Sequence, residues 1–287
     1  MATLREIKQR IKSVKNTQQI TKAMKMVAAA KLRRAQERMM NARPYAEKIK
    51  ELIRDLSASV ENPQLDLLKV RPVERLSLIV VTGDRGLCGS FNSHAIKKAI
   101  TEIDKFADVD VSIYAVGKKG YEFFNKRDYD VPNHKINFFN DLDYVHASEI
   151  ANEVMTKFIN GETDAVHLIY NEFKSVARQN LVAESLLPLT LEAYETHKSA
   201  EYIYEPNQAS ILKALLPRHI VIQIWRALLE SFASEQAARM MAMENATENA
   251  GEMISDLTLQ FNKARQAAIT KEILEIVGGA EALKSAS

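Results

Sequence analysis

Two long segments at the ends of the chain carry apolar residues at alternating spacings of three and four. Glycine is absent from residues 1–82, and Pro44 is the only proline before Pro63. The first segment has the spacing of a coiled-coil seam at Leu4, Ile7, Ile11, Val14, Ala28, Leu32, Ala35, Met39, Ala42, Ala46, Ile49, Ile53 and Leu56. A helix of about 58 residues, rising about 1.5 Å each, would be about 85 Å long. We expect a kink at Pro44, because its ring displaces the hydrogen bond to the preceding turn.

The seam of this first segment is polar in its middle. Gln18, Thr21 and Lys25 occupy seam positions, while Ile20, Met24 and Val27 lie on the neighbouring face. Polar seam residues can fix the register of two helices at some cost in stability. Alternatively, the helix turns this polar face to something other than its partner helix. We favour such a second contact surface, because apolar residues reappear on a second stripe.

The C-terminal segment repeats the pattern. Its expected seam consists of Ile222, Trp225, Leu229, Phe232, Met243, Ala246, Ala250, Met253, Leu257, Ala264, Ala267 and Leu274. Alanines dominate between residues 233 and 250, which allows a close approach of two helices. We expect Pro217 to mark the first turn or a kink, and Gly278 and Gly279 to end the helix.

Neither terminal helix can bury its apolar stripe alone. The two can pair with each other, antiparallel because they belong to one chain, or each can pair with a second copy in a dimer. The sequence leaves both arrangements open.

The middle of the chain has the pattern of an α/β domain. Apolar, β-branched runs at residues 76–82, 109–116 and 165–170 predict buried parallel strands, and the stretches 92–105, 117–127 and 147–160 predict helices between them. The predicted fold class is α/β, a long coiled coil of the two terminal helices plus a Rossmann-like doubly wound domain. The predicted divisions are residues 1–70, 71–205 and 206–287.

The first predicted strand ends in a glycine-rich turn that contains Gly83, Gly86 and Gly89. Such a turn before a helix can cradle a phosphate with backbone N–H groups. However, the spacing is G-x-x-G-x-x-G, and no Gly-Lys-Ser/Thr follows. We therefore favour a structural turn that requires the conformational freedom of glycine.

Charge is distributed unevenly along the chain. Residues 1–50 contain fourteen basic and three acidic residues, a net charge of +11, whereas residues 51–217 carry −7 and residues 218–287 carry −2. A basic end predicts an acidic partner, nucleic acid or an anionic surface. Nucleic acid is disfavoured, because Tyr45 is the only aromatic residue among these basic positions.

Searches for catalytic and metal-binding patterns find none. The six histidines show no metal-ligand spacing, and the single cysteine, Cys88, has no nearby histidine to mark it as a nucleophile. We predict no cofactor, no metal and no enzymatic activity of the chain alone. The sequence contains no run of about 18 apolar residues, so no segment is predicted to span a membrane. With no secretory signal at the N-terminus, we expect a cytoplasmic location.

Several stretches together resemble one family, the γ subunits of bacterial F-type ATP synthases. They are ITKAMKMVAAAKLRRAQ at 20–36, TGDRGLCGSFN at 82–92, SEQAARMMAMENATENA at 234–250 and ITKEILEIVGGA at 269–280. The resemblance implies a rotor shaft inside a ring of α and β subunits, with its base on the membrane c ring beside ε. It implies a peripheral location on the cytoplasmic face of the plasma membrane. Rotation driven by ion flow would move the β sites through their conformations.

The resemblance also implies roles for individual residues. Met24 and Lys25 match the position that faces an acidic loop of β, and Arg239 matches a position coupled to Met24. The region that engages β near the top of the ring corresponds to Arg265, Gln266, Thr270 and Glu272. The foot that meets the c ring and ε corresponds to Tyr202, Tyr204, Glu205 and Pro206. Residues 273–283 would turn inside the α/β ring. The alternative function is a nucleotide-binding α/β protein that dimerises through its terminal helices.

Overall fold

The computed structural model describes residues 3–59, 65–190, 204–205 and 207–285. The chain divides into two compact units, which are described separately. The helix-pair unit consists of Met1–Val27 and Ala242–Ser287, and the α/β unit is Ala28–Met241. Helices α1 (Leu4–Ser59) and α5 (Gln208–Ser285) each contribute to both units. The division at residues 70 and 205, which follows chain segments instead of contacts, stays a prediction.

A five-stranded sheet forms the centre of the α/β unit. Its strands are β1 (Arg75–Val81), β2 (Asp110–Val116), β3 (Asn133–Lys135), β4 (Ala165–Phe173) and β5 (Gln179–Leu187). Their order is β3-β2-β1-β4-β5, and every neighbouring pair is parallel except β4 with β5. The three predicted strands are confirmed. The edge strands β3 and β5 were not predicted, since neither is a continuous apolar run.

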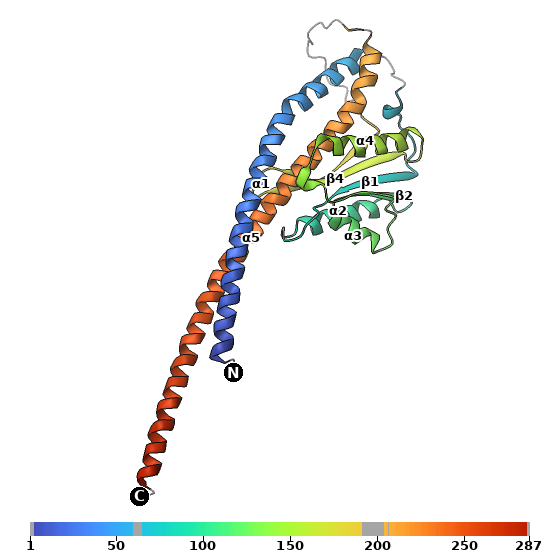
Figure 1. The fold of residues 1–287 in the computed structure, drawn as a ribbon. Coiled ribbons are helices and arrows are strands. Elements are labelled where there is room, and N and C mark those ends of the chain that lie inside the picture. The colour runs from blue at the N-terminus through green and yellow to red at the C-terminus, as the bar shows by residue number, and fades with distance from the viewer. Residues whose placement is uncertain (1–2, 60–64, 191–203, 206, 286–287) are drawn as a thin grey trace. The chain divides into compact units, whose positions relative to one another are not determined.

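Helices cover both faces of this sheet (Figure 1). On one face, α2 (Phe91–Asp104) and α3 (Lys118–Asn125) pack against a core that includes Leu78, Val80 and Ile113. On the other face, α4 (Tyr144–Ile159), α1 and α5 enclose a larger core, which includes Ile79 and Val81 of the same strand. Because alternate residues of β1 are buried on opposite faces, the sheet is doubly wound as predicted.

In the α/β unit, α1 and α5 pack closely through small side chains. Leu32 and Ala35 of α1 form one cluster with Ala233 and Ala237 of α5, and all four are at most 5% exposed. Alanine at these positions brings the two backbones near each other and fills the space between them. Helix α1 continues through Pro44 without interruption and curves in its second half (Figure 1).

In the helix-pair unit, the two helices run antiparallel and within one chain. The Gln18 Nε2 donates to the Thr247 carbonyl at 3.4 Å, the hydroxyls of Thr21 and Thr247 lie 2.7 Å apart, and Lys25 pairs with Glu244. As the contact residue moves forward along α1, its partner moves backward along α5, which is the order of an antiparallel pair. Intrachain pairing decides between the two arrangements that the sequence left open. The polar residues Gln18, Thr21 and Lys25 face the partner helix inside the seam, as the register interpretation requires. The favoured alternative, that this face is turned to something other than the partner helix, is wrong for these three residues.

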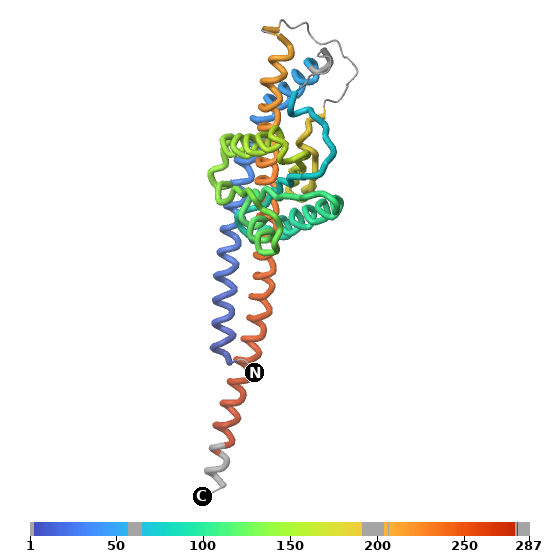
Figure 2. Tube along the Cα trace, turned by 90° about the vertical axis from the view of Figure 1, so that its right-hand side faces the viewer, coloured from blue at the N-terminus to red at the C-terminus, as the bar shows by residue number. Residues whose placement is uncertain are grey.

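Several expectations for α5 are wrong. The helix begins nine residues before Pro217 and continues past Gly278, which shows no positive φ and has open space where a Cβ would stand. A glycine that keeps helical dihedrals costs about 1 kcal/mol but does not end a helix. Met253 and Leu274 are 53% and 65% exposed, and Ala267 is also exposed, so these residues lie outside the seam. Figures 1 and 2 show α5 extending beyond the N-terminal end of α1, so the end of α5 has no part of α1 beside it.

Candidate functional site

The polar part of the α1 seam is a set of contacts across the helix pair. Thr21 is 8% exposed, and its hydroxyl also donates to the Gln18 carbonyl at 3.1 Å. Lys25 and Glu244 form an ion pair whose side chains are 37% and 35% exposed. A pair this exposed stabilises by at most about 1 kcal/mol. Sequence reasoning missed Glu244 and Thr247, because their partners become evident only once the register is known.

Met24, a predicted contact with another subunit, is half-buried on α1. Ile20 and Val27, which lie near Met24 on the same face of α1, are 60% and 56% exposed, whereas Met26, 61% exposed, lies on another face. The structure thus places an apolar stripe on the outside of the helix pair. Its contact with a partner stays a prediction.

The last described turns of α5 carry no partner helix. The predicted contact residues Arg265, Gln266, Thr270 and Glu272 are all exposed. Around them, Ile269, Ile273, Ile276 and Val277 are between 48% and 72% exposed. These four apolar residues recur at helical spacing on a single face, the pattern of a helix that buries this face against another surface.

Only half of the predicted foot lies within the described residues. Tyr204 is half-buried and packs against the large core of the α/β unit, and Glu205 is exposed. Tyr202 and Pro206 lie outside the described residues. The predicted contact with a c ring and ε therefore stays a prediction.

The glycine loop, residues 83–92, connects β1 to α2. Of its three glycines, Gly89 has a positive φ of 59°, Gly83 lies against Glu235, and Gly86 has open space around it. The Asn92 Oδ1 accepts a hydrogen bond from the Gly83 N–H at 2.8 Å. This bond occupies a donor that a bound phosphate would need, which argues against the phosphate interpretation.

Two ionisable residues of α5 approach this loop. Glu235 and Arg239 form an ion pair at 2.5 Å with side chains only 5% and 11% exposed, and Arg239 also donates to the Gly86 carbonyl at 3.2 Å. Arg239 was predicted to couple to Met24, which stays a prediction; its observed contacts lie within the α/β unit. Glu235 was missed as a functional candidate, although its spacing of four from Arg239 was a signal for an ion pair on one helix face.

Cys88, in the same loop, is buried. Burial raises the pKa of the Cys88 thiol, which opposes formation of the reactive thiolate. This observation supports a structural role for the side chain. Among the described residues, no three His, Cys, Asp or Glu side chains are arranged to hold a metal ion. Nor does any helix within the described ranges combine the length and hydropathy needed to span a membrane.

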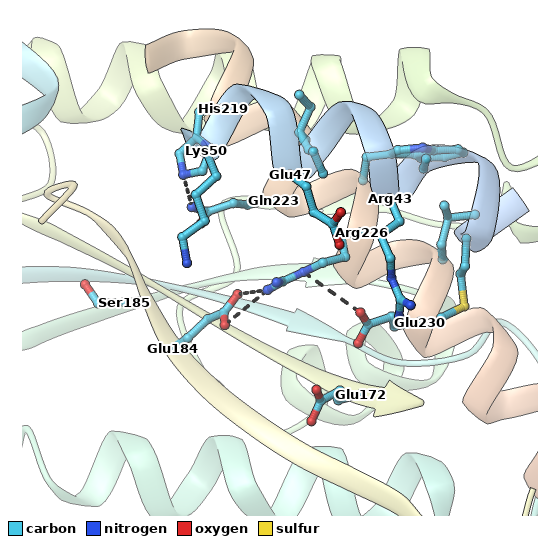
Figure 3. Close-up of a pocket in the computed structure, with 16 residues that line it drawn as sticks. Arg43, Glu47, Lys50, Glu172, Glu184, Ser185, His219, Gln223, Arg226 and Glu230 are labelled. Carbon is cyan, nitrogen blue, oxygen red and sulfur yellow. Dashed lines mark hydrogen bonds and ion pairs between the residues drawn. The ribbon is translucent and has the colours of Figure 1, made fainter. Parts of the chain in front are cut away.

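A cleft of about 480 Å³ lies between α1, α5 and the last two strands. Figure 3 shows Arg226 reaching from α5 toward Glu184 of β5 and Glu230 of α5. Arg226 donates to Glu184 at 3.0 Å, and its Nε lies 3.9 Å from Glu230. The other charged groups that line the cleft are Arg43, Glu47 and Lys50 of α1 and Glu172 of β4.

Burial shifts two titratable groups in this cleft. Burial, together with repulsion from Glu172 and Glu184, raises the pKa of Glu230 to about 7, although Arg226 opposes the shift. Burial, together with the charges of Lys50 and Arg226, lowers the pKa of His219 to about 4. Both shifts favour the uncharged form of the group, which limits the cost of keeping it away from water.

Comparison with known proteins gives one consistent result. Residues 3–283 match the family model described as ATP synthase. The chain is 50% identical to the ATP synthase gamma chain of Chloroherpeton thalassium over 100% of both chains. It is also 50% identical to the ATP synthase gamma chain of Prosthecochloris aestuarii over 99% of both chains.

Solved structures agree with this assignment. A chain from the central stalk and c-ring structure of the Tetrahymena thermophila mitochondrial ATP synthase is similar, with a TM-score of 0.62 and 30% identity. That match covers 79% of this chain and 99% of the other. A chain of the Euglena gracilis mitochondrial ATP synthase, at 20% identity and a TM-score of 0.72, covers 98% of this chain and 95% of its own, and shows the fold alone. The chain belongs to the ATP synthase gamma-chain family, the subunits of the central stalk.

Proposed function

We propose that this chain is the central rotor shaft of an F-type ATP synthase. It couples ion-driven rotation of the membrane c ring to the conformational cycle of the catalytic β subunits, in synthesis or hydrolysis of ATP. The chain itself performs no bond chemistry and takes no cofactor. It is held peripherally at the cytoplasmic face of the plasma membrane through its partners α, β, ε and the c ring.

The observation that carries this proposal is the family match over the full length of the chain. The exposed apolar face at the end of α5 supports it further, because this face requires a surface that the described part of the chain does not supply. A ring of α and β subunits would supply that surface. In this arrangement Arg265, Gln266, Thr270 and Glu272 contact β, and the foot at residues 202–206 contacts the c ring and ε.

The charge distribution suits a shaft that must turn. Between residues 1 and 50 the chain carries a net charge of +11, and acidic loops of β would face it. Exposed ion pairs of at most about 1 kcal/mol each can break and re-form at every step of rotation. Met24 and Lys25 lie at the level where the seam that faces α5 is polar and the outer face of α1 carries exposed apolar residues. We assign them to contact with β.

Reconstitution tests the proposal directly. We expect the purified chain, added to membranes depleted of the γ subunit, to restore proton pumping driven by ATP hydrolysis. The chain alone should hydrolyse no ATP, and it should co-purify with α and β. Failure of the wild-type chain to assemble or to restore pumping would overturn the proposal.

A charge substitution tests the assigned contact. We expect Met24→Lys to lower the protons pumped per ATP hydrolysed and to steepen the temperature dependence of turnover, because an added charge near β deepens one angular state. Met26→Lys is the matched control, since Met26 carries the same substitution on another face of α1. Equal effects of both substitutions would contradict the assignment of Met24.

The second candidate, a nucleotide-binding protein that dimerises through its terminal helices, loses its structural basis. The terminal helices pair within the chain, and Asn92 occupies the Gly83 N–H. Calorimetry with ATP separates the two functions, because only the second candidate requires tight binding by the isolated chain.

A further inference from the structure

Glu235 and Arg239 hold the glycine loop against α5. The Arg239 guanidinium contacts the Glu235 carboxylate at 2.5 Å and the Gly86 carbonyl at 3.2 Å. Glu235 in turn lies directly over Gly83, where an added Cβ would stand 2.8 Å from the carboxylate. One buried ion pair thus contacts both ends of the turn between Gly83 and Gly86.

The loop is in turn tied to the rest of the α/β unit. The Asp84 carboxylate accepts the N–H groups of Lys118 at 3.0 Å, Asn137 at 2.8 Å and Phe139 at 3.4 Å. The Asn92 side chain bridges the Gly83 N–H and the Arg85 carbonyl. Any displacement of the loop therefore also moves the start of α3 and the segment that follows β3.

Stability alone does not account for a charged pair at this position. Desolvation of two charges often cancels their attraction, and apolar replacements of similar volume are frequently neutral or stabilising. One nitrogen of Arg239, however, donates to both the Glu235 carboxylate and the Gly86 carbonyl, which fixes the positions of these two acceptors relative to each other. The pair therefore supplies a defined orientation of the loop relative to α5.

We propose that Glu235 and Arg239 are positioning residues that clamp the glycine loop onto α5, so that the loop and the segments joined to it through Asp84 turn with this helix. The proposal rests on the proposed shaft function. It adds a mechanical connection between a shaft helix and the α/β unit, separate from any contact with β. Loss of the clamp lets the loop shift relative to α5, while the packed core and the hydrogen bonds of Ser231 and Ser234 with Asn171 still hold the helix on the sheet.

The test uses four variants in the reconstituted complex. They are Glu235→Gln, Arg239→Lys, the double variant Glu235→Gln with Arg239→Gln, and Glu230→Gln as the matched control. Glu230 lies on the same helix, is also largely buried and also faces an arginine four residues away, but it lines the cleft instead of the loop. The readout is protons pumped per ATP hydrolysed, compared at matched hydrolysis rates.

The double variant separates a clamp from simple charge compensation. If the pair only neutralises two buried charges, removing both restores wild-type coupling. If it is a clamp, the double variant stays as poorly coupled as the single variants. In the complete chain, amide exchange of residues 83–92 should also rise about tenfold in each clamp variant, the equivalent of one lost charge-assisted hydrogen bond.

Two outcomes overturn the proposal. One is wild-type coupling in the double variant, and the other is loop exchange no faster than in Glu230→Gln. If a single variant fails to assemble, the double variant and the exchange measurement decide. A wild-type chain that fails to restore pumping overturns the proposed shaft function, whereas wild-type pumping with unaffected variants overturns only the clamp.

Discussion

Helices α1 and α5 pair in both units of the molecule, but different chemistry joins them in each. In the α/β unit, Leu32, Ala35, Ala233 and Ala237 form a buried apolar contact. In the helix-pair unit, hydroxyl and amide contacts and an ion pair about one-third exposed to solvent occupy the seam near Thr21. The same two helices therefore change from a core to a partly polar contact along their length.

This difference indicates where the molecule is rigid. Burial of apolar area contributes about 25 cal/mol per Å², while an exposed ion pair contributes at most about 1 kcal/mol. Regions with few buried apolar contacts open locally at lower free energy than the core. We therefore expect the helix-pair unit to open first, a property that suits contacts remade at every turn.

The largest expected effect comes from truncating one seam leucine in each unit. Leu32→Ala should lower the free energy of unfolding by about 3 kcal/mol, because it leaves a cavity beside Ala233 and Ala237. Leu257→Ala, at a half-buried seam position of the helix-pair unit, should cost about 1 kcal/mol. Denaturant unfolding, monitored by the hydrogen exchange of each unit, measures the loss of stability in both variants. Equal losses would contradict the contrast between the units.

The next effect tests how tightly the α/β unit is packed at the glycine loop. Gly83→Ala should destabilise by about 2 kcal/mol, because the new Cβ meets the Glu235 carboxylate. Gly86→Ala is the control within the same loop, with nothing within 4 Å, and should change stability by at most about 0.5 kcal/mol. Fluorescence of Trp225, the single tryptophan, reports unfolding of this unit. A smaller loss of stability in Gly83→Ala than in Gly86→Ala would show that the loop can shift away from α5.

A smaller effect concerns pH and is confined to the α/β unit. Because the pKa of His219 is lowered from 6.5 to about 4, protonation of this group decreases the free energy of unfolding as pH falls from about 6.5 toward 4. Because the pKa of Glu230 is raised from 4.5 to about 7, its contribution is complete below pH 4.5 and is lost as pH rises toward 7. The two slopes oppose each other, so the wild-type chain should be nearly insensitive to pH between 4.5 and 6.5.

Removing one of these groups should reveal the other. Glu230→Gln should lose stability on acidification between pH 6.5 and 4.5, and His219→Gln should lose it on alkalinisation, each by about 1 kcal/mol per pH unit. Urea unfolding at several pH values, followed by Trp225 fluorescence, measures both slopes. Parallel slopes in the two variants would contradict the opposite pKa shifts.

The smallest effect lies in the polar seam of the helix-pair unit. Thr21→Val and Thr247→Val should each cost about 1 kcal/mol, because each leaves the other hydroxyl without its partner across the helices. The double variant should be close to wild type, since both partners are then apolar and of similar shape. Hydrogen exchange of residues 4–27 provides the measurement. Additive losses would show that the two hydroxyls do not interact.

Periodicity was a sufficient signal for much of the fold. A spacing of three and four predicts helices whatever they pack against, and the apolar runs of β1, β2 and β4 predict strands that are buried on both faces. The short β3 and the edge strand β5, most of whose residues are only half-buried, lack such runs and were missed. For the candidate site, the sequence marked Arg239 and the loop glycines but not Glu235 or Asn92.

The sequence by itself determined which segments are helical, which strands are central and to which family the residues point, because these depend on local spacing and on residue type. Tertiary structure alone decided that the terminal helices pair within one chain and that Thr21 meets Thr247. It also decided that Gly83 must be small because Glu235 lies over it. Such contacts join residues more than 100 positions apart, and their free energy depends on a register that no local pattern specifies.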